Sequence, residues 1–105
     1  MAQKRKVWLL AHFRIGLIRE GIEKADGLNR LARVIGYRSR IHPAWPLRQI
    51  LVGRQPFPFD RLEKLAAFLE YDIDTVLKYE AATQRLANEQ TDSALRSNGF
   101  YAASL

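Results

Sequence analysis

The chain has 105 residues, of which 48% are hydrophobic, and carries a formal net charge of +6. This length fits one domain with a modest core, and the hydrophobic fraction excludes a disordered polyelectrolyte. The lack of cysteine excludes a disulfide scaffold and a zinc finger. Because the two histidines have no clustered partners in the sequence, we expect no bound metal and no other cofactor.

The charge is unevenly distributed along the chain. Residues 1–57 carry twelve basic and three acidic side chains, whereas residues 58–105 carry five basic and eight acidic ones. Between Gly27 and Phe59 there are six arginines and no acid. This composition is typical of a surface that faces nucleic-acid phosphates.

The N-terminus has the basic start and apolar run of a secretory signal. However, His12 and Arg14 interrupt the run, and no small-residue cleavage site follows. No apolar stretch approaches the roughly 20 residues that span a bilayer. We therefore expect a soluble cytoplasmic, nucleoid-associated protein without a membrane segment.

Two helices are predicted first, from apolar residues that recur every three or four positions. The first covers residues 7–25, and its apolar sector is so wide that it is either nearly surrounded or in contact with a partner chain. The second covers residues 28–35, with Asp26 as its N-cap and Gly36 as its C′ residue.

Residues 37–46 are predicted to form a loop or a strained helix start. Either Pro43 or Pro46 fits the first turn of a third helix, which runs to about Val52 and ends at Gly53.

The rest of the chain is predicted to form a loop, two more helices and a tail, with no strand. After the loop at 54–59, Asp60 and Glu63 predict a capping box for a fourth helix. Asp72 caps a fifth, which extends to about Asn88. Residues 91–105 are expected to be mobile unless Phe100 and Tyr101 dock.

The second and third predicted helices together have the pattern of a helix-turn-helix. Ala32 permits a close helix crossing, Gly36 releases the chain into the turn, and Leu47, Ile50 and Leu51 anchor the third helix. The opposite face of that helix is then free to enter a DNA groove.

From about Leu28 to Leu77 the chain resembles the helix-turn-helix domains of phage lambda repressor and Cro type, the XRE family. The matching residues are Leu31-Ala32, Gly36, Leu47, Ile50, Gly53-Arg54, Pro58, Leu62, Leu65-Ala66, Leu69 and Asp72–Leu77. The segment Ile22–Gly36 is also similar to small phage Cro-like proteins of the YdaS type. One departure is that ten residues, Tyr37–Pro46, separate the glycine from the first recognition-helix aliphatic, about twice as many as is usual in the family.

The resemblance implies an all-α, five-helix lambda-repressor-like domain over residues 1–90, followed by a flexible or partner-docked tail over 91–105. It implies a phage-like transcriptional regulator, such as a repressor, that binds double-stranded DNA with its third helix in the major groove. A domain of this size reads a short half-site, so we expect a homodimer. Its interface would use helix 1, helix 5 or the Phe100-Tyr101 tail.

Ten residues are predicted to contact DNA, and most of them have a plainer alternative. Arg38, Ser39 and Arg40 are expected at phosphates or in a groove, the alternative being a solvated loop. Arg48 is expected to pair with guanine and Gln49 with adenine, the alternative being a solvated helix face.

The other five predicted contacts flank these. Ala44 and Trp45 lie one turn earlier, and Trp45 either touches a thymine methyl or sugar, or packs in the core or an interface. His42 is expected to cap the third helix or touch phosphate. By resemblance, Arg54 contacts phosphate, and Arg33 projects from the helix that crosses the DNA backbone, although surface solvation fits Arg33 nearly as well.

Two further interpretations stay open at this stage. The basic terminus Lys4-Arg5-Lys6 is either an arm that wraps DNA or an idle end. The acidic C-terminal half and the aromatic tail favour a different class, a helical module such as an antitoxin or assembly subunit whose main ligand is protein. An enzyme is not expected, because the sequence has no paired-carboxylate motif, no glycine-rich phosphate loop and no His/Cys cluster.

Overall fold

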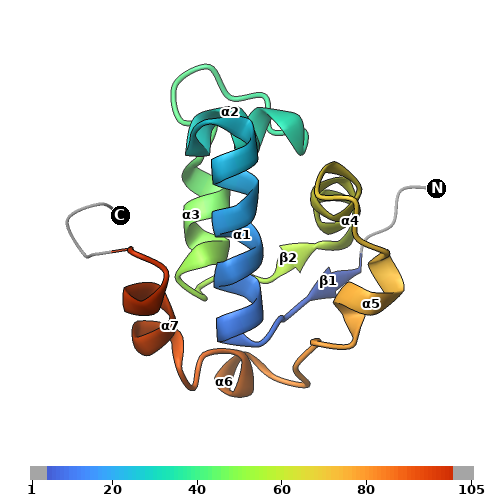
Figure 1. Cartoon of the computed structure of the whole chain (residues 1–105), viewed down its shortest axis with the longest axis vertical. Helices are drawn as coiled ribbons and strands as arrows, with labels where there is room; N and C mark the ends of the chain where they lie inside the picture. Colours follow the sequence, from blue (N-terminus) through green and yellow to red (C-terminus); the bar gives the residue numbers. More distant parts are fainter. Residues whose placement is uncertain (1–4, 101–105) are drawn as a thin grey trace.

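The structure, a computed structural model, describes residues 5–100 of the chain and is mostly helical (Figure 1). The predicted contributions of Lys4 and Tyr101 lie outside the described residues. The elements follow in the order β1 (Lys6–Val7), α1 (Ala11–Ala25), α2 (Leu28–Val34), α3 (Trp45–Leu51), β2 (Phe57–Pro58), α4 (Phe59–Phe68), α5 (Ile73–Leu77), α6 (Gln84–Ala87) and α7 (Thr91–Ser97).

Helix α1 is the centre of the packing (Figure 1). It contacts α2, α3 and α7, while α4 packs against α2, α5 and β2. Within residues 5–100, none of the helices combines the length and the apolar character that crossing a membrane requires.

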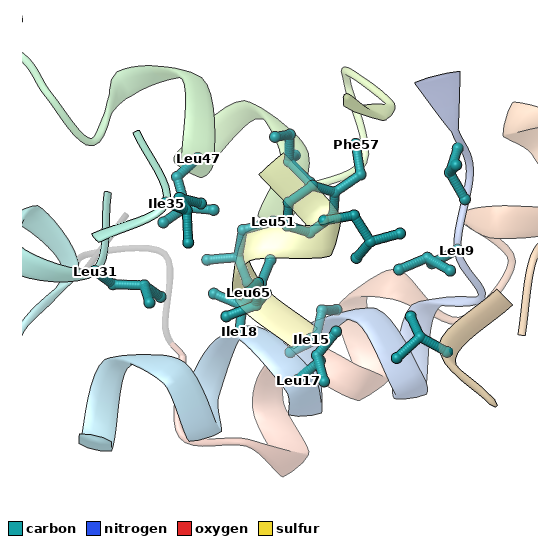
Figure 2. Packing of buried hydrophobic residues seen from close by; sticks show 14 of the residues in the cluster. Leu9, Ile15, Leu17, Ile18, Leu31, Ile35, Leu47, Leu51, Phe57 and Leu65 are labelled. Atoms are coloured by element: carbon teal, nitrogen blue, oxygen red, sulfur yellow. The ribbon is translucent and has the colours of Figure 1, made fainter. Parts of the chain in front are cut away.

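The core lies where α1, α2, α3 and α4 face one another (Figure 2). Its largest side chains are aliphatic, and Ile18, Leu31, Leu47 and Leu65, one from each of these helices, are fully buried. Removing such a side chain from water contributes about 1.5–3 kcal/mol. The inward face of α3 is therefore fixed by three other helices.

The predicted ends of α2 and α3 are confirmed. Gly36 (φ 108°) and Gly53 (φ 87°) both follow a helix in the left-handed region. At each end, the N–H of the glycine and the N–H of the next residue donate to carbonyl groups of the last helical turn. This is the Schellman motif, which favours glycine. Pro46 occupies the first turn of α3, where its missing N–H costs little.

The first predicted helix starts later than expected, and a small sheet takes its place. Val7 pairs antiparallel with Phe57, and Lys6 with Pro58. The predicted loop at 54–59 therefore contains a strand. Proline restricts the residue before it to extended conformations, so Pro56 and Pro58 hold this segment extended and ready to pair.

Two predicted caps are wrong. Asp26 is the C-cap of α1, in the left-handed conformation (φ 64°), and Gly27 stands at the N-cap of α2. Helix α4 begins one residue before Asp60, so Asp60 is not its N-cap. The N-cap residue is Pro58, whose side chain makes no capping hydrogen bond to any described residue. Asp72 is at the N-cap of α5, as predicted.

The C-terminal third also differs from the five-helix prediction. Helix α5 ends at Leu77, because the chain then turns to bond with the segment before α1: the Leu10 N–H donates to the Tyr79 carbonyl over 3.0 Å. Helices α6 and α7 follow. The first part of the segment predicted as a tail, residues 91–105, forms a helix. Helix α7 packs on α1 and buries Ala94 and Leu95, and Phe100 lies against the same core.

Arg14 is buried in the middle of this arrangement, with only 2% of its surface exposed. Its guanidinium donates to the carbonyls of Leu9 (2.8 Å), Ala87 (3.0 Å) and Leu51 (3.4 Å), and to the Thr91 hydroxyl (3.1 Å). It thereby joins α1 to the ends of α3 and α6 and to the start of α7. Arg14 belongs to the basic half of the chain, and its buried position gives it a structural role.

The surroundings of Arg14 suit a cation without an acidic partner. Leu51 and Ala87 are the last residues of α3 and α6, where carbonyl groups lack intrahelical partners and carry partial negative charge. Burial lowers the pKa of Arg14 to about 10, so the guanidinium stays charged at neutral pH.

We predict that Arg14→Met destabilises the protein by about 3 kcal/mol, because four buried acceptors lose their donor. Urea unfolding followed by circular dichroism measures this. The matched control is Arg19→Met, on the same helix but half exposed, which should change the unfolding free energy by less than about 1 kcal/mol. Equal stabilities for the two variants would contradict the role given to Arg14.

Candidate nucleic-acid interface

Helix α3 has one buried side and one side that faces solvent. Leu47 and Leu51 are fully buried, and Ile50 is 2% exposed. Trp45, Arg48, Gln49 and Val52 recur at the helical spacing of i, i+3, i+4 and i+7, so they form one outward stripe. Trp45 is the most exposed of them, at 58%. We call these four residues the outward face of α3.

The loop before α3 carries cations on its surface. Arg38 and Arg40 are exposed, and so is Ile41, at 79%. The Ser39 hydroxyl accepts a hydrogen bond from the His42 N–H over 3.1 Å, which gives this part of the loop a local turn. The loop therefore presents two guanidinium groups beside an exposed aliphatic side chain.

Two predicted contact residues have different places from those expected. Ala44 is 2% exposed and lies in the core, so its side chain is not available to DNA. Ala44 is also the N-cap residue of α3, which corrects the capping role given to His42. His42 remains exposed, and its carbonyl accepts a hydrogen bond from the Trp45 N–H.

The arginines of the acid-free stretch are largely unpaired. Within residues 5–100, only Arg30 of the six makes an ion pair, with Asp26 over 3.1 Å. The other five have no ion-pair partner among the described residues: Arg33, Arg38, Arg40, Arg48 and Arg54. Their charges are therefore available to an external anion.

Arg48 has a side-chain nitrogen, Nε, without a hydrogen-bond partner among the described residues. Its Nε atom is buried, while the side chain as a whole is half-buried on the outward face of α3. The Nε group therefore lies against α3 without a protein acceptor, and the guanidinium keeps hydrogen-bond donors that a ligand can use.

Two open hollows lie beside the start of α3, and Trp45 and Pro46 line both. One, of about 640 Å³, is also lined by Ser39, His42 and Arg48. Three other predicted contacts, Ser39, His42 and Arg48, are thus brought together around Trp45.

The second hollow, of about 460 Å³, has a different set of polar groups. Besides Trp45 it is lined by Gln49, Gln55, Tyr37 and Lys6. Burial raises the pKa of Tyr37, so its phenol keeps its proton at neutral pH. The sequence patterns did not single out Tyr37 and Gln55, and the pairing of β1 with β2, which brings Lys6 to the same hollow, was not predicted.

Arg33, Arg38, Arg40 and Arg54 stand apart from the two hollows. All four are exposed, and none of them is among the residues that line the two hollows. Arg54 follows Gly53 directly and its N–H donates to the Gln49 carbonyl, which fixes the backbone of Arg54 at the end of α3.

The basic N-terminal arm is partly engaged within the chain. Arg5 pairs with Glu80 over 2.6 Å and lies over the ring of Phe59. Lys6 belongs to β1 and reaches the second hollow. Residue 4 lies outside the described part. Among the described residues of this segment, which was interpreted as either a DNA-wrapping arm or an idle end, only Lys6 makes no ion pair.

The end of α3 is held by a hydrogen-bond chain from the C-terminal helices. Asn88 donates to the Gly53 carbonyl over 2.7 Å, and the Thr91 hydroxyl donates to Asn88 over 3.0 Å. Thr91 in turn accepts from Arg14. The position of the outward face of α3 thus depends on α6 and α7 as well as on the core.

Within residues 5–100 there is no cluster of three or more side chains of the types that bind metal ions. Comparisons of the chain with known protein families, curated proteins and solved structures find no match.

We predict that Gly53→Ala destabilises the protein by more than Gly99→Ala. Both glycines have positive φ, at 87° and 83°, so alanine is strained at either position by about 1–2 kcal/mol. At Gly53 the added Cβ also overlaps the Asn88 amide, whereas at Gly99 it meets open space. Thermal unfolding of both variants measures the difference. Equal losses would show that Asn88 does not hold the end of α3.

Proposed function

We propose that this protein is a sequence-specific transcriptional regulator that binds double-stranded DNA. In this proposal α2 and α3 act as a helix-turn-helix, and the outward face of α3 enters the major groove. The resemblance to XRE-type domains supports it. The single observation that carries it is that an exposed helix face lies within a stretch of unpaired arginines and no acids.

The side chains of the outward face suit base edges. The major groove is wide enough for a helix and presents a distinct donor and acceptor pattern for each base pair. Arg48 can donate two hydrogen bonds to guanine, and Gln49 can both donate to and accept from adenine. These residues are our candidates for direct base contacts.

The remaining arginines suit phosphates. Arg38 and Arg40 on the loop before α3, Arg54 after it and Arg33 on α2 are all exposed and unpaired within the described residues. Phosphate contacts fix the register of a protein on the duplex without reading its sequence. The longer loop at 37–46 then enlarges the backbone contact beside the groove.

Homodimerisation is part of this proposal, and one apolar face suits it. Leu10 (42%), Tyr79 (42%) and Leu86 (38%) are exposed large side chains. Together with Phe13, whose ring stacks on Tyr79 at 3.9 Å between centroids, they line one shallow hollow. This face joins α1 and the chain from α5 to α6, two of the regions expected to mediate a dimer.

The same apolar face supports an alternative function, a helical module whose main ligand is another protein. The C-terminal tail supports it less than expected, because Phe100 packs on the chain's own core. Weak, sequence-indifferent DNA binding together with a stoichiometric protein partner would favour this alternative.

We predict that the affinity for duplex DNA falls steeply with salt, because bound arginines displace counterions from phosphates. Arg48→Ala should relax base preference at one position by about 1–3 kcal/mol, whereas Arg40→Ala should weaken all sequences alike. Arg85→Ala, an exposed arginine outside the acid-free stretch, is the matched control. Fluorescence anisotropy on a set of single-base variants measures all three. A flat salt response would remove the proposal.

We predict that Leu86→Glu converts a dimer to a monomer, because a buried carboxylate without a partner disfavours the interface. Light scattering would report the 12.1 kDa chain mass for the variant and twice that mass for the natural protein. Leu86 is on the surface of α6, so the fold should tolerate the change. A natural protein that stays monomeric both free and on DNA would contradict the dimer.

A further inference from the structure

Trp45 is unusual among the aromatic side chains because it is 58% exposed at the start of a helix whose other side is buried. Its side chain borders a hollow toward Arg48 and another toward Gln49, the two residues one turn further along α3. Neither hollow is enclosed by the described residues. The indole therefore lies between two open spaces, each beside one edge of the outward face of α3.

Each hollow has the size and the polar groups that a nucleobase requires. Their volumes, about 640 and 460 Å³, are within the range of about 300–1,000 Å³ that small-molecule sites occupy. The larger one offers the His42 imidazole and the Arg48 guanidinium. The smaller one offers the amides of Gln49 and Gln55, which can pair with the edge of a base.

We propose that Trp45 is a stacking platform for unpaired nucleobases, with one base in each of the two hollows. The protein then binds DNA that contains unpaired bases more tightly than the fully paired duplex of the same sequence. This inference rests on the proposed DNA binding and adds a preferred state of the DNA. Base stacking on an aromatic side chain strengthens binding and is sequence-tolerant, because every base has a π face.

The charges around the two hollows favour a nucleic acid over a peptide as the occupant. Lys6 and Arg48 line them, and Arg38 and Arg40 are on the adjoining loop, whereas no acidic residue lies between Gly27 and Phe59. A strand whose bases enter the hollows carries its phosphates past these cations. A fully paired duplex keeps its bases stacked on one another and cannot fill either hollow.

Fluorescence titration tests the proposal with three probes: a paired duplex, the same duplex with a two-thymine bulge, and a single-stranded oligothymidine. In a Trp8→Phe background Trp45 is the remaining tryptophan, and stacking should quench its emission. We expect the bulged duplex to bind about tenfold more tightly than the paired one, which is the effect of about 1.4 kcal/mol.

Trp45→Ala should abolish that tenfold gain, measured for the variant itself as the ratio of its affinities for the bulged and the paired duplex. Ile41→Ala is the matched control, because Ile41 is an exposed apolar side chain nearby that lines neither hollow. It should keep the gain. The quenching measurement does not depend on any Trp45 variant, and circular dichroism checks that both variants fold.

The outcomes separate this inference from the proposed function. Equal affinity for paired and bulged duplexes, without quenching, overturns the stacking role and leaves duplex binding intact. Binding of the bulged duplex and the oligothymidine alone supports the stacking role and overturns sequence-specific duplex recognition. No binding to any of the three probes at low salt overturns both.

Discussion

One buried cation determines how the rest of this small protein is arranged. Arg14 donates to three backbone carbonyls and a hydroxyl that come from four different segments, and no acid neutralises it among the described residues. Taking a charge from water is costly, and the hydrogen bonds from both terminal nitrogens of Arg14 offset that cost, whereas its Nε has no partner among the described residues. Only an arrangement that brings the ends of α3 and α6 together around α1 provides those acceptors. The short C-terminal helices are thereby tied to the helix that carries the candidate DNA contacts.

The protein has two exposed faces with different chemistry, and the first of them is the outer side of α3. Aliphatic packing from α1, α2 and α4 holds its inner side, and the Arg14–Thr91–Asn88 chain holds its last turn. Its outer side is left with an exposed indole, a guanidinium and an amide beside unpaired arginines. The exposed aromatic and aliphatic side chains at Leu10, Tyr79 and Leu86 are the second face. A polar cationic face for DNA and an apolar face for a second copy are the two surfaces that the proposed dimeric regulator needs.

Several patterns of local origin could be predicted from the sequence, although the caps assigned to Asp26 and Asp60 were wrong. Long-range contacts could not be predicted. The glycine ends of α2 and α3 and the proline in the first turn of α3 follow from backbone geometry within a few residues, and they were predicted correctly. The pairing of Val7 with Phe57 joins residues fifty positions apart, and two-residue strands have no periodic signal. The buried position of Arg14 was not predicted for the same reason, because three of its four acceptors come from residues that are distant in sequence. The smaller hollow beside Trp45 is lined partly by Lys6 of β1 and Pro58 of β2, so only part of the site was foreseeable.

The central claim is that the outward face of α3, held in place by the core and by Arg14, is the surface that meets duplex DNA. The most direct measurement is a nuclear magnetic resonance titration of the labelled protein with a duplex recovered from a random library by selection for binding. We expect the largest chemical-shift changes on the Trp45 indole N–H, the side chains of Arg48 and Gln49, and the amides of residues 38–42. Changes that instead concentrate on the face of Leu10, Tyr79 and Leu86, with α3 unaffected, would contradict it.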